Sequence, residues 1–229
     1  MPDILGLPLF SLCLTLGAYL LGLWCKQKVK RSFCNPFMIA TVLVGAFLLL
    51  TRMPMADYQK GMDTVGWLLT PATVALAIPL YEQTKAMRKN LPAILAGVVA
   101  GAVSSLMMVL SLCLLFALPR EISVSLLPKS ITTAIGMVLA DQGGGIGSLT
   151  AGVIAVTGLV GVLLGPVFSK VFRLKNAICQ GVAYGTASHV LGTTKALETD
   201  PLAGAVSSLS LVVAGLLTAV ILPLITMWI

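Results

Sequence analysis

The sequence predicts an all-α polytopic membrane protein, organised as a single transmembrane domain over residues 1–229. Its residues are 58% hydrophobic and 10% charged, with a mean hydropathy of +1.01, whereas soluble domains carry about 25% charged residues. The length provides for seven to eight membrane segments of about 20 residues each. Most basic residues gather in short loops, as expected of cytoplasmic connections. These three observations together predict the fold class.

Apolar segments separated by charged or turn-forming stretches are expected to form the membrane helices. They span residues 4–25, 36–51, 62–82, 91–118, 124–141, 146–169, 178–197 and 202–229, numbered here first to eighth. The first lacks the basic start and cleavage site of a signal peptide, so we expect a retained helix. Trp24, Trp67 and Trp228 lie at segment ends, where tryptophan anchors helices at the interface. Pro92 and Pro201 are expected in the opening turns of helices.

The basic loops constrain how many segments cross the membrane. Ten of the fifteen Lys and Arg residues lie in three loops, namely Lys26, Lys28, Lys30 and Arg31; Lys85, Arg88 and Lys89; and Lys170, Arg173 and Lys175. If all three loops face the cytoplasm, one of the three segments between the second and third loops cannot cross. The fifth segment is the candidate, because Pro128 and Lys129 interrupt it and Asp141 begins a glycine-rich end. We therefore predict a broken or re-entrant segment over 124–145, which requires surrounding protein or a water-filled cavity.

The same count predicts an inverted repeat. Residues 36–118 form the first repeat and residues 124–229 the second, inverted one. The third and seventh segments hold corresponding places and both carry small, hydroxyl and helix-breaking residues, which is a pointer to a transporter's binding site. The hexapeptide GAVSSL occurs at 101–106 and again at 204–209. It is weak evidence for a repeat, because small residues also serve close helix packing.

Broken helices in lipid expose backbone N–H groups that, with the helix dipole, favour an anion such as a carboxylate. The lone Lys129 adds a full charge, and an ammonium at membrane depth costs about 2.5–3.5 kcal/mol. We therefore expect a carboxylate site where the third, fifth and seventh segments meet. The predicted substrate-binding residues are Thr70, Pro71, Thr73, Lys129, Ser130, Thr132, Thr133, Thr186, Ser188, His189, Thr193 and Thr194.

A proton or charge relay through His189, Lys195 and Asp141 is a further hypothesis, because histidine titrates near neutral pH. Each candidate has a structural alternative. Lys129 could reach the interface instead, and His189, the only histidine, could pack between helices. Lys195 could form a solvated pair with Glu198, and Asp141 could simply begin a hydrated loop.

No enzyme signature is visible, and no cofactor or metal is predicted. The five cysteines are dispersed without ligand spacing, so they indicate neither a disulfide framework nor a metal site. There is no Walker A or dinucleotide fingerprint. The positive charge belongs to the loops, so no nucleic-acid partner is expected. The absence of an ATP motif favours secondary transport.

Three long motifs resemble those of the LrgB/CidB family. They are LTPATVALAIPLYEQ at 69–83, LPKSITT at 127–133 and GTASHVLGTTKAL at 185–197, and the similarity covers essentially the whole chain. In the family the second motif usually reads PKSVTTPIA, whereas this chain has Ala134 and Gly136 in place of the last proline and alanine. This departure bears on the geometry of the break in the fifth segment.

The resemblance implies a bacterial inner-membrane protein that works with a smaller LrgA/CidA-type membrane partner. It implies a fold akin to inverted-repeat transporters with broken helices, such as cation/proton antiporters and bile-acid symporters. Two functions attach to the family. One is holin/antiholin-like control of murein hydrolases and autolysis. The other is transport of small carboxylates, through similarity to the plastid glycolate/glycerate translocator and to bacterial pyruvate-uptake systems.

Residues and resemblance together lead us to expect a multi-pass secondary transporter of small monocarboxylates, of the pyruvate, glycolate and glycerate class, in the bacterial cytoplasmic membrane. The alternative is an antiholin-like modulator that acts by protein interaction and transports nothing. A pore is less favoured because it requires a homo-oligomer, and self-association stays open.

Overall fold

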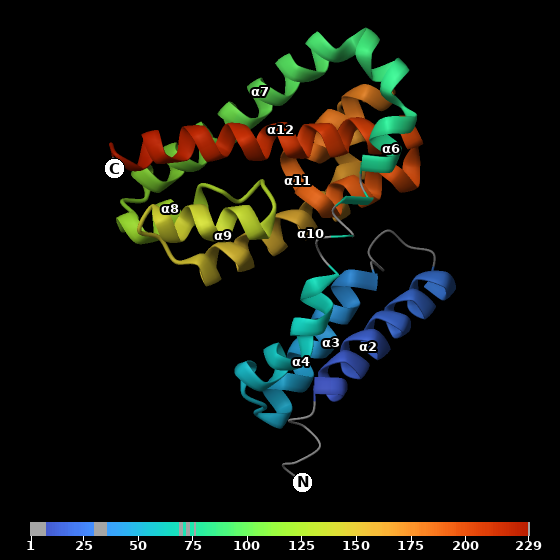
Figure 1. Cartoon of the computed structure of the whole chain (residues 1–229), viewed down its shortest axis with the longest axis vertical. Coiled ribbons are helices and arrows are strands. Elements are labelled where there is room, and N and C mark those ends of the chain that lie inside the picture. Colours follow the sequence, from blue (N-terminus) through green and yellow to red (C-terminus); the bar gives the residue numbers. More distant parts are fainter. Residues whose placement is uncertain (1–7, 30–35, 69–70, 72–73, 76, 229) are drawn as a thin grey trace. The chain divides into compact units, whose positions relative to one another are not determined.

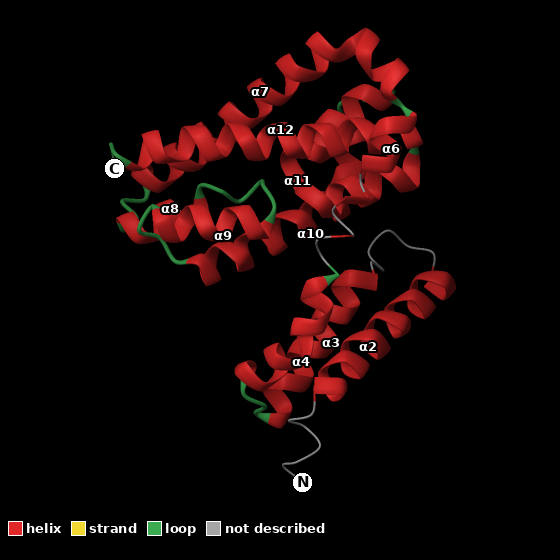
Figure 2. Ribbon diagram, in the orientation of Figure 1, coloured by secondary structure: helices red, strands yellow, loops and turns green. Residues whose placement is uncertain are grey.

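The structure is a computed structural model that describes residues 8–29, 36–68, 71, 74–75 and 77–228. Every regular element among these residues is a helix, and none is a strand (Figure 2). The chain divides into two compact units, Met1–Ala75 and Leu76–Ile229, and each is described by itself. The boundary between them falls inside the predicted first repeat, 36–118.

In the first unit, three helices lie within the described residues. These are α2 (Pro8–Val29), α3 (Pro36–Thr51) and α4 (Met55–Trp67). Ala18 of α2 packs against Ala40 and Val44 of α3 to form a small apolar core. The Thr15 hydroxyl lies 2.8 Å from the Tyr58 hydroxyl, and this hydrogen bond joins α2 to α4.

The second unit contains the remaining helices (Figure 1). These are α6 (Ala77–Glu82), α7 (Thr84–Leu115), α8 (Arg120–Leu126), α9 (Thr133–Gln142), α10 (Gly147–Val171), α11 (Ala177–Thr199) and α12 (Pro201–Thr226). The long helices α7 and α12 lie side by side, and α11 packs on α12, α10 and α7. Helix α9 packs mainly on α10. Helix α9 and the end of α8 lie in the predicted fifth segment, 124–145.

Two apolar clusters hold the second unit together. In one, Ile94 and Val98 of α7 pack against Val206 of α12. In the other, Leu106 of α7 and Leu222 of α12 enclose Leu127, which follows α8. The break after α8 is therefore anchored between the two long helices.

Small residues let α11 and α12 approach closely. A Cβ on Gly181 would come within 2.5 Å of the Ala203 carbonyl oxygen, so only glycine fits there. Between the two helices, Asp200 accepts hydrogen bonds from the amides of Leu202 and Ala203 at 2.7 and 3.1 Å. An N-cap of this kind stabilises a helix start by about 1 kcal/mol, and Pro201 at the first position completes it as predicted.

Within the described residues, four helices are long and apolar enough to cross a membrane. They are α7, α10, α12 and the Leu9–Lys28 part of α2, while α3 is apolar but shorter. Helix α11 has 23 residues, but its second half is rich in polar side chains. The all-helical membrane character is confirmed, and the seven to eight segments and the inverted repeat stay predictions. The placement of Pro92 in an opening turn is wrong, because α7 begins at Thr84 and contains Pro92.

Candidate functional site

Helix α11 is broken at its middle, in the predicted seventh segment. Ser188 has φ −132° and ψ 15°, and His189 has φ 43° and ψ −136°, while the residues on both sides are helical. The φ of His189 lies in the left-handed region, which costs about 1–3 kcal/mol for such a residue. The predicted helix interruption in this segment is confirmed.

The His189 ring points toward α10. Its Nε2 lies 2.8 Å from the carbonyl oxygen of Ile154, and the residue is 5% exposed. Gly158 makes room for the ring, since a Cβ there would lie 2.5 Å from the imidazole. The arrangement matches the alternative in which histidine packs between helices with a satisfied ring nitrogen. A proton-carrying role for His189 stays a prediction.

Ser188 and Thr193 complete the break. Ser188 packs directly on Gly161 of α10, where a Cβ would overlap the serine side chain. The Thr193 hydroxyl donates to the His189 carbonyl oxygen at 3.0 Å and lies 2.9 Å from the Ser207 hydroxyl of α12. Thr193 and Ser207 are both fully buried. The irregular backbone of α11 is therefore held by a backbone carbonyl and a glycine of α10 and by the Ser207 side chain of α12.

Lys129 lies in the second break, between α8 and α9, and is half-buried. Its Nζ donates a hydrogen bond to the Ser130 hydroxyl at 3.0 Å. The Ser130 hydroxyl in turn lies 3.1 Å from the Ser105 hydroxyl of α7. No carboxylate in the described parts of the chain pairs with the ammonium. A substrate-binding role for Lys129 stays a prediction.

A small cavity lies between the break that follows α8 and the turn of α11 that precedes its own break. It measures ≈ 10 Å³ and is lined by the polar residues Ser105, Ser130, Thr186 and Thr218 together with apolar neighbours. That volume suits about one water molecule. Thr186 precedes the break in α11, and its hydroxyl donates to the Val182 carbonyl oxygen at 2.7 Å. The structure thus brings Ser130 and Thr186, two predicted residues, to one cavity.

Thr132 and Thr133 lie at the start of α9. Thr132 is the residue before the helix, but its side chain makes no capping hydrogen bond. Thr132 is half-buried, and Thr133 is exposed as the first helical residue. Because α9 begins at Thr133, its first backbone amides follow Lys129 closely along the chain. Gly136 lets α9 lie close to α10, since a Cβ there would come within 2.5 Å of the Ile154 side chain.

Asp141 has a local structural role. Its Oδ1 accepts a hydrogen bond from the Gly147 amide, the first residue of α10, at 2.8 Å. Nearby, the Ser125 hydroxyl accepts from the Ile146 amide at 2.7 Å, and the Thr150 hydroxyl donates to the Ser125 carbonyl at 2.9 Å. The two Ser125 bonds fix α8 to the beginning of α10, and the Asp141 bond fixes the end of α9 there. A relay role for Asp141 stays a prediction.

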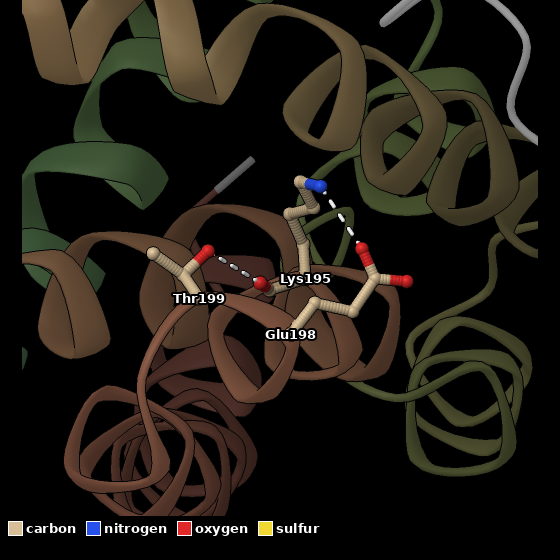
Figure 3. Close-up of polar contacts among 3 residues, drawn as sticks. All are labelled: Lys195, Glu198 and Thr199. Atoms are coloured by element: carbon tan, nitrogen blue, oxygen red, sulfur yellow. Dashed lines mark hydrogen bonds and ion pairs between the residues drawn. The ribbon is translucent and has the colours of Figure 1, made fainter. Parts of the chain in front are cut away.

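Lys195 forms an ion pair with Glu198, as the structural alternative expected. Its Nζ lies 2.9 Å from Glu198 Oε2, and the two side chains are 30% and 44% exposed (Figure 3). Solvent-accessible pairs of this kind contribute little to stability. Thr194 is also exposed, and its hydroxyl donates to the Val190 carbonyl at 3.1 Å. Neither Lys195 nor Thr194 lines the cavity, and the functional roles of both residues stay predictions.

The third predicted segment is only partly described. Thr70 and Thr73 lie outside the described residues. Pro71 is described as exposed and belongs to the first unit. The contribution of this segment to a substrate site therefore stays a prediction.

Three hydroxyl residues that line or support the site are not among the residues predicted from the sequence. Ser105 and Thr218 line the cavity, and Ser207 contacts Thr193. The repeated hexapeptide was the available signal, because Ser105 lies in its first copy and Ser207 in its second. Each copy combines small residues for close packing with a hydroxyl that reaches a broken segment.

A metal centre is not formed by the described side chains, among which no three His, Cys, Asp or Glu residues come together. The polar groups of the site are hydroxyls, one imidazole and one ammonium. Such groups bind small anions and neutral polar molecules by hydrogen bonds and charge.

The fold and the site define a helical membrane protein that contains a broken helix and a half-buried cation. Residues 15–228 match the model of the LrgB-like family. The chain therefore belongs to the LrgB-like family. No solved structure matches it.

Curated relatives of similar length support this assignment. The chain is 35% identical over 217 residues to "Antiholin-like protein LrgB" of Bacillus subtilis (strain 168), with 94% of each chain covered. It is 33% identical over 215 residues to "Holin-like protein CidB" of Staphylococcus aureus, again with 94% of each covered. "Uncharacterized protein YxaC" of Bacillus subtilis is 36% identical over 212 residues, covering 93% of this chain and 92% of that protein.

Proposed function

We propose that this chain is an antiholin-like membrane protein that modulates murein hydrolase activity and autolysis. The observation that carries this proposal is the full-length similarity to relatives named antiholin-like and holin-like. Such a modulator acts through contacts with a smaller LrgA/CidA-type membrane protein in the bacterial cytoplasmic membrane. The four long apolar helices provide the membrane anchoring that this role requires.

A second candidate function is transport of a small monocarboxylate of the pyruvate, glycolate and glycerate class. It is favoured by a specific observation: Lys129 is half-buried beside Ser130 and Ser105 without a carboxylate partner in the described chain. A half-buried ammonium without a counter-ion is costly unless an anion binds it. The carrier would be an inverted repeat whose broken segments alternate access to this site.

In the carrier, the carboxylate would bind the Lys129 ammonium and the first amides of α9. Hydroxyls of Ser130 and Thr186 lie at the adjacent cavity and would orient the substrate. His189 would act on the other side of α11, either by holding the break or by carrying a proton. A purely interacting subunit has no evident need for such a cluster.

One experiment with two readouts separates the functions. Proteoliposomes containing the full chain, with and without the partner, are tested for uptake of labelled pyruvate, glycolate and glycerate. Cells producing the chain and its partner are tested for their rate of lysis and murein hydrolase activity. The modulator predicts altered lysis without uptake of any of the three acids. The carrier predicts uptake of at least one.

Lys129→Ala sharpens the result, with Lys60→Ala as the matched control. Lys60 is a lysine whose side chain is 70% exposed and paired with Asp57 at 3.1 Å. A carrier loses uptake with Lys129→Ala but retains it with Lys60→Ala. Unchanged uptake with Lys129→Ala would remove that residue from the mechanism. Unchanged lysis in the absence of the chain would contradict the modulator.

A further inference from the structure

An apolar groove lies between α10 and α11. One end of the groove lies at the loop that joins these two helices. Its volume is ≈ 300 Å³, at the small end of the range for ligand sites. One face of α10 forms its wall from Thr157 to Ser169, and Ala183 and Ala187 of α11 form the opposite wall. The twelve residue steps of α-helix from Thr157 to Ser169 extend for about 18 Å. The groove is therefore long and narrow.

We propose that this groove binds an acyl chain of an anionic phospholipid, with the phosphate headgroup bound by the basic loop at its end. The groove is shaped by glycines: Gly161 lies against Ser188, and Gly165 lies against the Tyr184 ring. Its rim is formed by apolar side chains that are strongly exposed, including Val160 at 46% and Phe168 at 52%. In a membrane protein such a rim faces hydrocarbon, so a lipid chain is the occupant of matching chemistry.

The charge at the loop end of the groove supports an anionic headgroup. Ser169 and Leu174 line this end. Lys170, Arg173 and Lys175 lie in the same turn, all are exposed, and within the described residues none forms an ion pair. Basic clusters immediately beside membrane helices attract anionic lipids. The apolar groove and the three cations are therefore adjacent parts of one surface.

The turn that carries these cations has a defined conformation. The Leu174 amide donates to the Ser169 carbonyl at 2.8 Å, and the Arg173 amide donates to the Lys170 carbonyl at 3.2 Å. This is the Schellman arrangement, in which the residue after the C-cap is left-handed and usually glycine. Arg173 occupies that position with φ 52°. The loop therefore holds an arginine where the backbone alone would favour glycine.

This geometry provides a sharp charge-removing variant. Arg173→Gly removes the cation at a position whose backbone suits glycine, so the turn is preserved. The triple variant Lys170→Gln, Arg173→Gly and Lys175→Gln removes the predicted headgroup contacts. Ala183→Phe fills the groove and leaves every charge in place.

Lipid retention by the purified full chain tests the proposal. The protein is equilibrated with equal amounts of phosphatidylglycerol and phosphatidylcholine, and bound lipid is measured by native mass spectrometry. The unchanged protein should retain phosphatidylglycerol preferentially. In the triple variant, the ratio of retained phosphatidylglycerol to retained phosphatidylcholine should fall by about fivefold for each charge removed. Ala183→Phe should lower the retention of both lipids.

The second basic cluster serves as a control for general surface charge. Lys85→Gln, Arg88→Gln and Lys89→Gln together remove the same number of cations at the start of α7, and this variant should keep the preference for phosphatidylglycerol. Equal retention of the two lipids by the unchanged protein would overturn the proposal. It would also be overturned if Ala183→Phe altered the oligomeric state while lipid retention stayed the same, because a second copy would then occupy the groove.

Discussion

His189 is a histidine in a backbone conformation that suits glycine. Its φ of 43° lies in the left-handed region, where a side chain crowds the following carbonyl. The imidazole nevertheless bonds the Ile154 carbonyl oxygen at 2.8 Å. The hydrogen bond of the ring therefore stabilises His189 in a backbone conformation that is unfavourable by itself. The break in α11 depends on both the hydrogen bond and this backbone conformation.

Two substitutions at this residue separate the ring from the backbone. His189→Ala and His189→Gly both remove the ring contact, but only glycine relieves the left-handed φ. We expect both variants to be less stable than the unchanged protein, with His189→Gly more stable than His189→Ala by about 1 kcal/mol. Thermal unfolding in detergent measures the difference. A His189→Ala variant as stable as His189→Gly would show that the break carries no backbone strain.

The histidine was predictable as a site candidate, but its partner was not. The sequence places His189 among small and hydroxyl residues, which indicated an interrupted helix. The Ile154 carbonyl is a backbone group in another helix, so no side-chain pattern could identify it. The same holds for Ser105, whose hydroxyl reaches Ser130 from α7 and gains meaning only when the helices are packed.

At the scale of elements, α10 and α11 are packed through glycines on α10. Gly158, Gly161 and Gly165 occupy one face of that helix and contact His189, Ser188 and Tyr184 respectively. Their spacing of three and four residues places them on one helical face. Close approach of the two helices is therefore necessary for the break in α11 to form as observed.

Two glycines of α10 give a matched test of this packing. A Cβ on Gly161 would overlap the Ser188 side chain, whereas a Cβ on Gly152 would meet nothing within 4 Å. We expect Gly161→Ala to destabilise the protein by about 1–3 kcal/mol through overpacking. Gly152→Ala should be neutral or stabilising, because alanine favours a helix over glycine by up to about 1 kcal/mol. Thermal unfolding of both variants, compared side by side, provides the measurement, and equal effects would contradict the packing argument.

The element boundaries show where sequence patterns are informative. The predicted segment at 146–169 agrees closely with α10, and 202–229 agrees with α12, because long apolar runs between polar turns define such helices. The start of α7 was missed. Helix α7 begins at Thr84 and includes the basic residues before Pro92, and charged residues at a helix end do not register in an apolar pattern.

At the scale of the whole molecule, the fifth predicted segment decides the topology. It contains the end of α8 and all of α9, separated by residues 127–132. Helix α9 has ten residues, which at a rise of 1.5 Å per residue extends for about 15 Å, roughly half of the hydrocarbon thickness. Neither short helix crosses a bilayer alone. If the three basic loops all face the cytoplasm, we expect the two ends of this segment to lie on the same side of the membrane.

Cysteine accessibility tests that topology. In a background without the native cysteines, single cysteines are placed at Lys89, Phe116, Gln142, Lys175 and Thr199, and each is labelled with a membrane-impermeant reagent in intact cells and in inverted vesicles. Lys89 and Lys175 should react only in inverted vesicles, because basic loops stay in the cytoplasm. Phe116, Gln142 and Thr199 should react in intact cells. Labelling of Phe116 and Gln142 from opposite sides would establish a full crossing by α8 and α9, and the inverted-repeat arrangement would then be wrong.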